Sequence, residues 1–366
     1  MPSAELLGEA RRIMTICNAC RYCEGFCAVF PAMERRRTFS SRDLIYLSSL
    51  CHNCRDCYYA CQYAPPHEFD LNVPKTFQEL RVETYMDFVW PGFLAGMFRR
   101  NGLIITMMTA VIVTIIMLSV LSQGTSIVFP SYFGKGSFYR VIPYALLVLP
   151  TSLILLWAFV AILKGALRFW QHIGGELGKL SNRRALARAT ADALKLRYLD
   201  GGGHGCNYPD ETFTHLRRRL HHLVFYGLLL TLAATTFAAI YDHILHLTAP
   251  YPFWSLPVML GTLGGVAIMI GSGGMIFFKW RSDKEPANSG LLGMDLAFSN
   301  LLFFTSLTGL LLLALRETSA MGMILAVHLG LVLSLFITLP YGKFVHGVYR
   351  YAALLQNAIE QLSEER

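Results

Sequence analysis

Charged side chains are scarce in this sequence of 366 residues: Asp, Glu, Lys and Arg make up 15% of it, against 54% hydrophobic residues. A soluble globular domain carries about a quarter charged residues. The missing polar surface indicates that lipid, and not water, covers much of the chain. The composition also excludes low-complexity disorder, a collagen-like fibre and a secreted disulfide scaffold.

Several motifs of organic catalysis are absent as well. The sequence contains no Ser–His–Asp constellation, no dinucleotide fingerprint and no paired carboxylates of a hydrolase. No Lys-Ser/Thr of a phosphate loop follows the three glycines at 201–203, and there is no C-x-x-C-H for covalent haem. These absences predict no catalytic residue of an organic reaction and favour one-electron transfer.

Cysteines are abundant in one place: eight of the nine fall within the first 61 residues. They form two runs of identical spacing, C-x2-C-x2-C-x3-C, namely Cys17, Cys20, Cys23 and Cys27, then Cys51, Cys54, Cys57 and Cys61. The start of the sequence lacks the apolar segment of a cleavable signal peptide, so we expect cytoplasmic thiols that bind metal. The spacing is that of bacterial ferredoxins, in which the fourth Cys of each run binds the other cluster.

We therefore predict two [4Fe-4S] clusters, one held by Cys17, Cys20, Cys23 and Cys61 and the other by Cys27, Cys51, Cys54 and Cys57. Zinc is the alternative, but zinc sites usually show two ligand pairs separated by a longer gap. The proline that usually follows the fourth Cys directly is displaced to Pro31 and Pro65. A helical segment is predicted between the two runs, and both departures fit the iron–sulfur modules of respiratory subunits.

Beyond residue 98 the composition changes to long uncharged runs. They are Leu103–Leu121, Val141–Leu163, Leu223–Tyr241, Phe253–Phe278, Leu296–Leu315 and Met321–Leu339. Each is long enough for a helix rising 1.5 Å per residue to cross a hydrocarbon core of about 30 Å. The predicted fold is mainly α: a bacterial ferredoxin-like, respiratory iron–sulfur domain over 1–98, then a six-helix transmembrane bundle over 99–366 with a long loop at 164–219.

The distribution of Lys and Arg predicts the orientation. The loop at 164–219 is rich in both, whereas the loops on the opposite side carry only Lys135, Arg140 and Arg316. By the positive-inside rule, both termini and the iron–sulfur domain lie in the cytoplasm at a bacterial inner membrane. The net charge of +8 then reflects orientation, and we expect no nucleic-acid partner.

Histidines near the ends of two spans point to haem. His328 and His346 are 18 residues apart, which is five turns of one continuous helix, or about 27 Å. On the antiparallel third span, His222 would lie level with His346, and His243 with His328. These pairs predict one or two b-type haems held non-covalently by imidazoles. Replacement of His222 by His221 or of His243 by His246 stays open, as does a plain role in capping helix ends.

The order of these parts, with the segment GlyGlyGlyHisGlyCysAsnTyrPro at 201–209, resembles the tricarballylate utilisation protein B family (TcuB, also called CitB) over essentially the whole chain. The membrane half is similar to the di-haem cytochrome b gamma subunit of nitrate reductases, particularly in the spacing of His328 and His346. The resemblance implies a partner FAD-dependent dehydrogenase that oxidises tricarballylate to cis-aconitate. This chain would reoxidise the partner's FAD and reduce membrane quinone.

We therefore expect an electron-transfer subunit of an oxidoreductase complex, with electrons passing from flavin through both clusters and the haem at His222 and His346 to quinone. The basic loop and Arg35–Arg37 would dock the partner. Asp295 would relay a proton to quinone or stabilise the start of the fifth span. Two alternatives remain: a haem-free iron–sulfur membrane anchor with a quinone site, and a membrane-bound iron–sulfur redox sensor.

Overall fold

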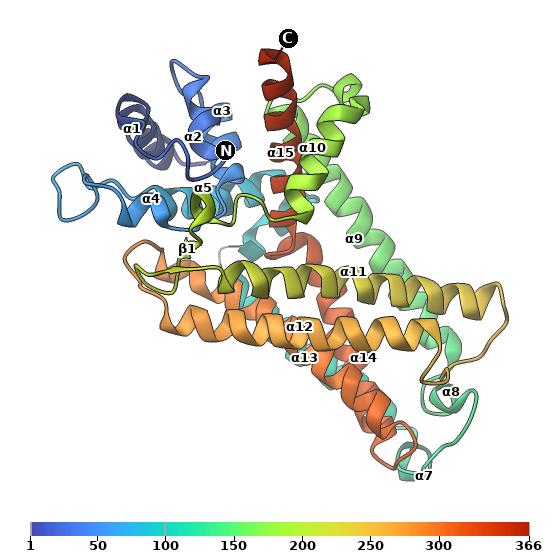
Figure 1. Cartoon of the computed structure of the whole chain (residues 1–366). Helices are drawn as coiled ribbons and strands as arrows, with labels where there is room; N and C mark the ends of the chain where they lie inside the picture. Colours follow the sequence, from blue (N-terminus) through green and yellow to red (C-terminus); the bar gives the residue numbers. More distant parts are fainter. Residues whose placement is uncertain (1, 99, 366) are drawn as a thin grey trace.

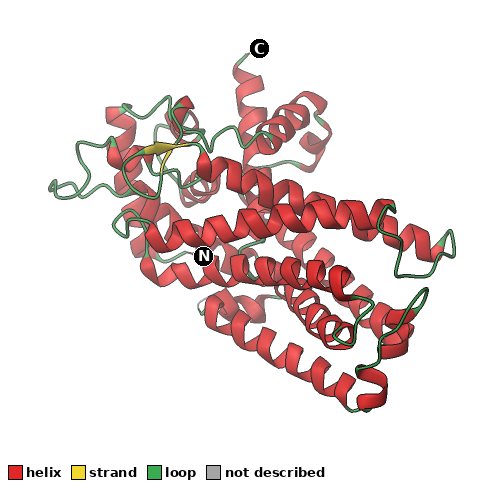
Figure 2. Cartoon of the chain, turned by 60° about the horizontal axis from the view of Figure 1, so that its bottom comes forward, coloured by secondary structure: helices red, strands yellow, loops and turns green. Residues whose placement is uncertain are grey.

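The computed structural model describes residues 2–98 and 100–365, and these are largely helical (Figure 1, Figure 2). The α-helices are α1 (Ala4–Cys20), α2 (Val29–Glu34), α3 (Ser41–Leu50), α4 (Asp56–Tyr59), α5 (Val73–Phe88), α6 (Asn101–Leu121), α7 (Thr125–Val128), α8 (Ser137–Val141), α9 (Tyr144–His172), α10 (Arg183–Leu194), α11 (Leu216–His243), α12 (Leu256–Arg281), α13 (Leu292–Leu315), α14 (Met321–Thr338) and α15 (Val345–Glu364). Short 3-10 turns are η1 (Gly92–Phe98), η2 (Leu177–Ser181), η3 (Gly201–Gly203), η4 (Ser289–Leu291) and η5 (Leu339–Tyr341). Strands β1 (Cys206–Asn207) and β2 (Phe213–Thr214) form one antiparallel pair.

The N-terminal head consists of α1 to α5. Side chains cap its helices at their starts: the Ser3 hydroxyl accepts a hydrogen bond from the Leu6 amide, and Ser40 and Asp43 form a capping box on α3. The head also has an apolar core of its own, with Met14, Ile45 and Phe77 among its fully buried side chains. A core of this kind fixes the loops that carry the cysteines.

The C-terminal helix and the long basic loop complete the head. The buried core of α1, α3 and α5 continues through Phe169 and Trp170 of α9 into Tyr349 and Leu354 of α15. Helix α10 packs along α15, and α15 lies against α3 (Figure 1). Residues hundreds of positions apart therefore enclose the same cysteine-rich segment.

Six helices within the described residues are long and apolar enough to cross a membrane, which confirms the mainly α, six-span fold. They are Asn101–Leu121, Tyr144–His172, Leu216–His243, Leu256–Arg281, Ser289–Leu315 and Met321–Tyr341. The second span runs nine residues past the predicted end at Leu163 because α9 continues into the core of the head.

The spans pack in an order that differs from a simple ring. Helix α11 packs on α12, α12 on α13, and α13 on both α6 and α14. Helix α9 contacts α14 and α15. Figure 1 shows α11 and α12 side by side as a long hairpin. The predicted facing of the third and sixth spans therefore does not describe the main contacts of α11.

The predicted continuous helix from His328 to His346 is wrong. Helix α14 ends at Thr338, η5 follows, and α15 begins at Val345. Pro340 cannot donate an amide hydrogen bond to a continuing helix, and Gly342 adopts an extended backbone. The two histidines consequently lie on different helices, so the five-turn geometry does not apply.

Glycines set the close approach of α11 and α12. A Cβ added at Gly264 would lie 2.8 Å from the carbonyl oxygen of Gly227, whereas one at Gly261 would lie 3.7 Å from the Cβ of Ala234. We expect Gly264→Ala to destabilise the hairpin by about 1–3 kcal/mol through overpacking, and Gly261→Ala to be neutral. Thermal midpoints in detergent measure both, and equal midpoints for the two variants would contradict the packing argument.

Candidate iron–sulfur and haem sites

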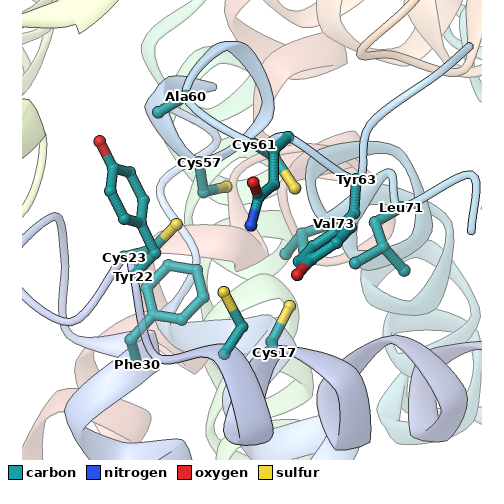
Figure 3. A pocket seen from close by; sticks show the side chains of 12 residues that line it. Cys17, Tyr22, Cys23, Phe30, Cys57, Ala60, Cys61, Tyr63, Leu71 and Val73 are labelled. Atoms are coloured by element: carbon teal, nitrogen blue, oxygen red, sulfur yellow. The ribbon is translucent and has the colours of Figure 1, made fainter. Parts of the chain in front are cut away.

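A cavity of about 260 Å³ lies between the two cysteine runs. Figure 3 shows the sulfur atoms of Cys17, Cys23 and Cys61 directed into one space. Cys20 and Cys57 line the cavity as well, and so do apolar and uncharged polar side chains such as Tyr63 and Val73. We call Cys17, Cys20, Cys23 and Cys61 the outer cysteine group.

Local structure explains this convergence. Cys17 and Cys20 occupy the last turn of α1 three residues apart, so their side chains share a face of the helix. Arg21 then adopts a left-handed conformation with φ of 57°, which ends the helix and turns the chain back toward Cys23. Cys61 follows the short helix α4 of the second run. The chain thus surrounds the cavity from two separate loops.

The other four cysteines, Cys27, Cys51, Cys54 and Cys57, form what we call the inner cysteine group. Burial raises the pKa of the Cys27 thiol, and the nearby Cys51 raises it further. The pKa of Cys57 is raised by burial first and then by Cys54, Cys27 and Cys51. In the outer group, burial raises the pKa of Cys17 to about 12, and Cys23, Cys61 and Cys20 add to this. Most of these influences lie within one predicted ligand set, but Cys23 of the outer group also acts on Cys57, which lies between the two groups.

The donor set fits four-iron clusters better than single metal ions. Among the described residues, no three His, Cys, Asp or Glu side chains lie close enough to hold one metal ion. In a [4Fe-4S] cluster each thiolate binds a different iron, so the sulfurs are spread around a cavity. The outer group and its cavity have this arrangement. A zinc site would require the four thiols to converge on one point.

The two groups differ in their access to solvent. Cys20 of the outer group is exposed, whereas Cys51 and Cys54 of the inner group are 7% and 6% exposed. The loop from Gly201 to Cys206 covers the inner group from one side. The backbone there requires glycine, since Gly201 has φ of +50° and an added Cβ would collide with Oδ2 of Asp56. The segment at 201–209 thus packs over the loops that carry the cysteines.

The structure brings His221 and His346 together in place of His222 and His346. The ring centres of His221 and His346 are 6.2 Å apart. Two imidazoles that bind opposite sides of one metal ion at about 2 Å each place their ring centres about 6 Å apart. His222 instead lies against Tyr226, with ring centres 5.8 Å apart. Adjacent residues of a helix point in directions about 100° apart, so only one of the two faces α15.

The Nδ1 atom of His346 is engaged by the backbone, so Nε2 is the ring nitrogen that is left for another partner. The His346 Nδ1 hydrogen-bonds to the Lys343 carbonyl at 2.5 Å, which directs the other ring nitrogen away. Burial lowers the pKa of His346 well below its usual range, and Arg350 lowers it further. The imidazole is therefore neutral near pH 7, which is the form that binds metal.

The outer pair of predicted haem ligands is not brought together. His243 is exposed and contacts Tyr144 and Asp242 at the far end of α11. His328 is enclosed between α14 and α13, where its Nδ1 lies 3.1 Å from the Thr308 hydroxyl oxygen and a Cβ added at Gly309 would lie 3.0 Å from its ring. Only the pair at the head end therefore has the spacing of two axial imidazoles.

Comparison with known proteins bears on the whole chain. The family model of citrate utilization protein B matches residues 96–365, and the model of its Fer4-like domain matches residues 10–87. The chain belongs to the citrate utilization protein B family. Citrate utilization protein B of Escherichia coli is 46% identical over 357 residues, which cover 96% of this chain and 92% of that protein. No solved structure matches the chain.

Membership of the citrate utilization protein B family confirms the resemblance drawn from the cysteine runs and the spans. The Fer4-like match indicates an iron–sulfur electron-transfer role in the use of citrate or tricarballylate. Six apolar helices fit a multi-pass membrane protein. Cluster number, haem and individual ligands stay predictions.

One further expectation for this citrate utilization protein B relative needs revision. Arg35 and Arg36, predicted to dock a partner, form ion pairs with Glu364 and Glu360 of α15 at 2.8 Å. They therefore hold the head to the C-terminal helix. Their spacing in sequence could not reveal acidic partners more than 300 residues away.

Sequence reasoning also missed the surroundings of Cys206. This ninth cysteine is buried beside Cys54, and burial raises its pKa to about 11. His204, two residues before it, is exposed and contacts Phe213. The run of four glycines in GlyGlyGlyHisGly was the available signal for a close approach of backbone to the cysteine loops.

Proposed function

We propose that this chain is the electron-transfer subunit that carries electrons from a reduced FAD-dependent dehydrogenase, through two [4Fe-4S] clusters and one haem b, to membrane quinone. The substrate of the partner would be tricarballylate or a citrate-like acid. Residues 1–98 would form the two-cluster domain, and residues 99–366 the cytochrome b-like membrane domain.

The observation that carries this proposal is a continuous series of candidate sites from surface to membrane. The outer cysteine group opens to solvent at Cys20, and the inner group lies behind it with Cys57 between the two. His52 directly follows Cys51 in the sequence, is buried, and is close enough to His221 for their charges to interact. His221 in turn faces His346.

The residues supply binding and insulation for one-electron carriers. Bound there, the clusters and haem exchange single electrons without making or breaking bonds to substrate. Thiolates of the two cysteine groups would bind iron, and the imidazoles of His221 and His346 would hold the haem. Burial of the inner group by the loop at 201–206 excludes water, and the exposed edge at Cys20 gives a partner flavin access.

The placement of basic residues supports the proposed orientation in a bacterial inner membrane. Helix α10 of the basic loop packs along α15, so this loop and the C-terminus lie on the same side as the head. That side would be the cytoplasm by the positive-inside rule.

Cysteine variants test the cluster assignment. We expect Cys54→Ala to remove one of two iron–sulfur signals, because the inner group loses a ligand. Cys206→Ser is the matched control, since Cys206 is buried next to Cys54 but lies outside both runs. Iron and sulfide analysis with electron paramagnetic resonance of the reduced protein measures both.

Four results would count against the proposal. Loss of a cluster in Cys206→Ser would overturn the ligand set, and zinc in place of iron would overturn the cofactor. Full iron–sulfur content with no Soret band would favour the alternative function, a haem-free iron–sulfur membrane anchor. Both carriers present but no quinone reduction would favour the redox sensor.

A further inference from the structure

Three arginines from three distant helices converge on the first turn of the second cysteine run. The Arg81 Nη1 on α5 donates to the Cys51 carbonyl at 3.3 Å, and the Arg350 Nη2 on α15 donates to the same carbonyl at 2.7 Å. Arg217 on α11 donates from Nη1 to the Asn53 carbonyl at 2.5 Å and from Nη2 to the His52 carbonyl at 3.3 Å. We call Arg81, Arg217 and Arg350 the arginine group.

These cations are enclosed, and none of them forms an ion pair with a carboxylate of the described residues. Arg81 and Arg217 are 5% and 8% exposed, and the Nε atoms of Arg217 and Arg350 are buried without a hydrogen-bond partner. Asp56 is the carboxylate that acts electrostatically on Arg217, so three cations face one nearby carboxylate. Backbone carbonyls accept hydrogen bonds from some of the guanidinium N–H groups but do not balance their charge. Buried charges without a counter-ion cost several kcal/mol each, so an anion bound at this site would offset part of that cost.

The inner cysteine group supplies that anion once it holds a cluster. Four thiolates carry more negative charge than the iron–sulfur core offsets, and reduction adds one more electron. Arg217 acts electrostatically on the Cys54 thiol and Arg350 on the Cys51 thiol, so both cations are near inner ligands. By contrast, no charged side chain lines the outer cavity.

Burial and charge oppose each other at the inner group. Burial alone disfavours the more negative, reduced state and would lower the potential of an inner cluster below that of an exposed one. Three nearby cations favour the reduced state, and their effect is strong where water does not screen it. The Asp56 carboxylate, which acts on Cys27 and Cys54, opposes the cations. Because three arginines stand against this one carboxylate, we expect the effect of the cations to prevail.

We propose that the arginine group raises the reduction potential of the inner cluster above that of the outer cluster, and so fixes the direction of electron flow toward the membrane. This inference rests on the two-cluster function proposed above. The step is one electron leaving the reduced outer cluster and reducing the inner one, with the partner's reduced flavin as donor. No bond or proton changes place. The arginines are positioning residues that touch ligand-bearing backbone.

Two of these arginines also lie near the histidine pair, so experiment must distinguish an effect on the cluster from an effect on the haem. Arg217 lies one helical turn before His221, and Arg350 one turn after His346. Each therefore lies between the inner cysteines and the histidine pair. Cations there could serve haem carboxylates in place of the cluster, which predicts a different response when the potentials are measured separately.

Redox titration of the purified full-length protein, followed by electron paramagnetic resonance, tests the proposal. A water-soluble paramagnetic relaxing agent broadens the signal of the exposed outer cluster and leaves the protected inner signal sharp. In the unmodified protein, the protected signal should titrate at the more positive potential. This result needs no variant, so failure of a variant to fold does not leave the proposal untested.

Variants then assign the effect to charge. We expect Arg350→Gln and Arg81→Gln each to shift the protected signal to more negative potential by at least a tenfold change in its oxidation equilibrium, which is about 59 mV for one electron. Arg350→Lys, which keeps the charge, should retain most of the potential. Arg188→Gln is the matched control, because Arg188 pairs with Glu365 at the surface of the head.

Three outcomes would overturn the inference: a protected signal more negative than the exposed one, unchanged cluster potentials in both glutamine variants, or a shift confined to the optically measured haem potential. Failure of the proposed function itself looks different. It would appear as one cluster or none in the unmodified protein, by iron and sulfide content, before any potential is compared.

Discussion

A His346→Ala variant should lose its b-type haem absorbance while keeping the iron–sulfur absorbance of the head. His346 faces His221 at the spacing of two axial imidazoles and has its Nδ1 fixed by the Lys343 carbonyl. Loss of an outer-shell partner of a metal ligand already weakens binding by about 10–100-fold, so loss of the ligand itself should cost more. Quinone reduction by the reduced partner should fall with it. Dithionite-reduced minus oxidised spectra and haem quantitation measure the result.

The chain provides a matched control in the next histidine. His221→Ala should reproduce the loss of haem, whereas His222→Ala should retain it, because His222 packs against Tyr226 away from α15. The same comparison tests the number of haems. The His221→Ala, His346→Ala double variant should contain no haem. If it keeps some haem, and this haem disappears only when His328 is also replaced, a second site exists and the single-haem proposal is wrong.

The second large effect should come from Asp295. Its carboxylate is 7% exposed and binds Lys279 of α12 at 2.5 Å and Lys343, before α15, at 2.7 Å. Removing one partner of a buried ion pair costs about 3–5 kcal/mol because it leaves a charge unpaired. Burial lowers the pKa of Lys343 to about 8 even with Asp295 beside it. We therefore expect Asp295→Asn to lower the thermal midpoint sharply.

The same variant should loosen the haem ligand. Lys343 holds Asp295 through its Nζ and His346 through its carbonyl, so a displaced Lys343 moves the partner of His346 Nδ1. The double variant Asp295→Asn, Lys343→Met should recover part of the lost stability, since it removes one unpaired cation. Asp242→Asn at the far end of α11 is the control, because Asp242 accepts from the Tyr144 hydroxyl and binds no Lys. An unchanged thermal midpoint in Asp295→Asn would contradict a stabilising role for the ion pairs of Asp295 with Lys279 and Lys343.

Features fixed by length and hydropathy were predictable from the sequence. Each of the six spans is found where an uncharged run predicts it, because crossing a bilayer imposes a minimum length on any apolar helix. The grouping of cysteines also follows from local spacing. Cys17 and Cys20 share a helical face whatever the rest of the chain does, and the cavity forms where the second run closes over it.

Features that depend on tertiary packing were not predictable in the same way. Whether His221 or His222 faces α15 depends on the rotation of α11, which Gly227 and Gly264 set through close packing on α12. Pro340 gave a local signal for a helix break that hydropathy alone hides. The acidic partners of Arg35 and Arg36 lie on the last helix, beyond the reach of any local pattern.

The enclosure of Cys51 by Arg350 has a consequence for biosynthesis. The two residues are 299 positions apart, and a ribosome adding about 5–20 residues per second needs roughly 15–60 s to make that stretch. During this time the second cysteine run has been synthesised, but the C-terminal helix does not yet cover it. If the inner group binds a cluster as proposed, iron and sulfide can reach an accessible loop in this interval, because the last helix is made only after all six spans. The order of synthesis thus leaves an interval for loading, and the C-terminal helix ends it.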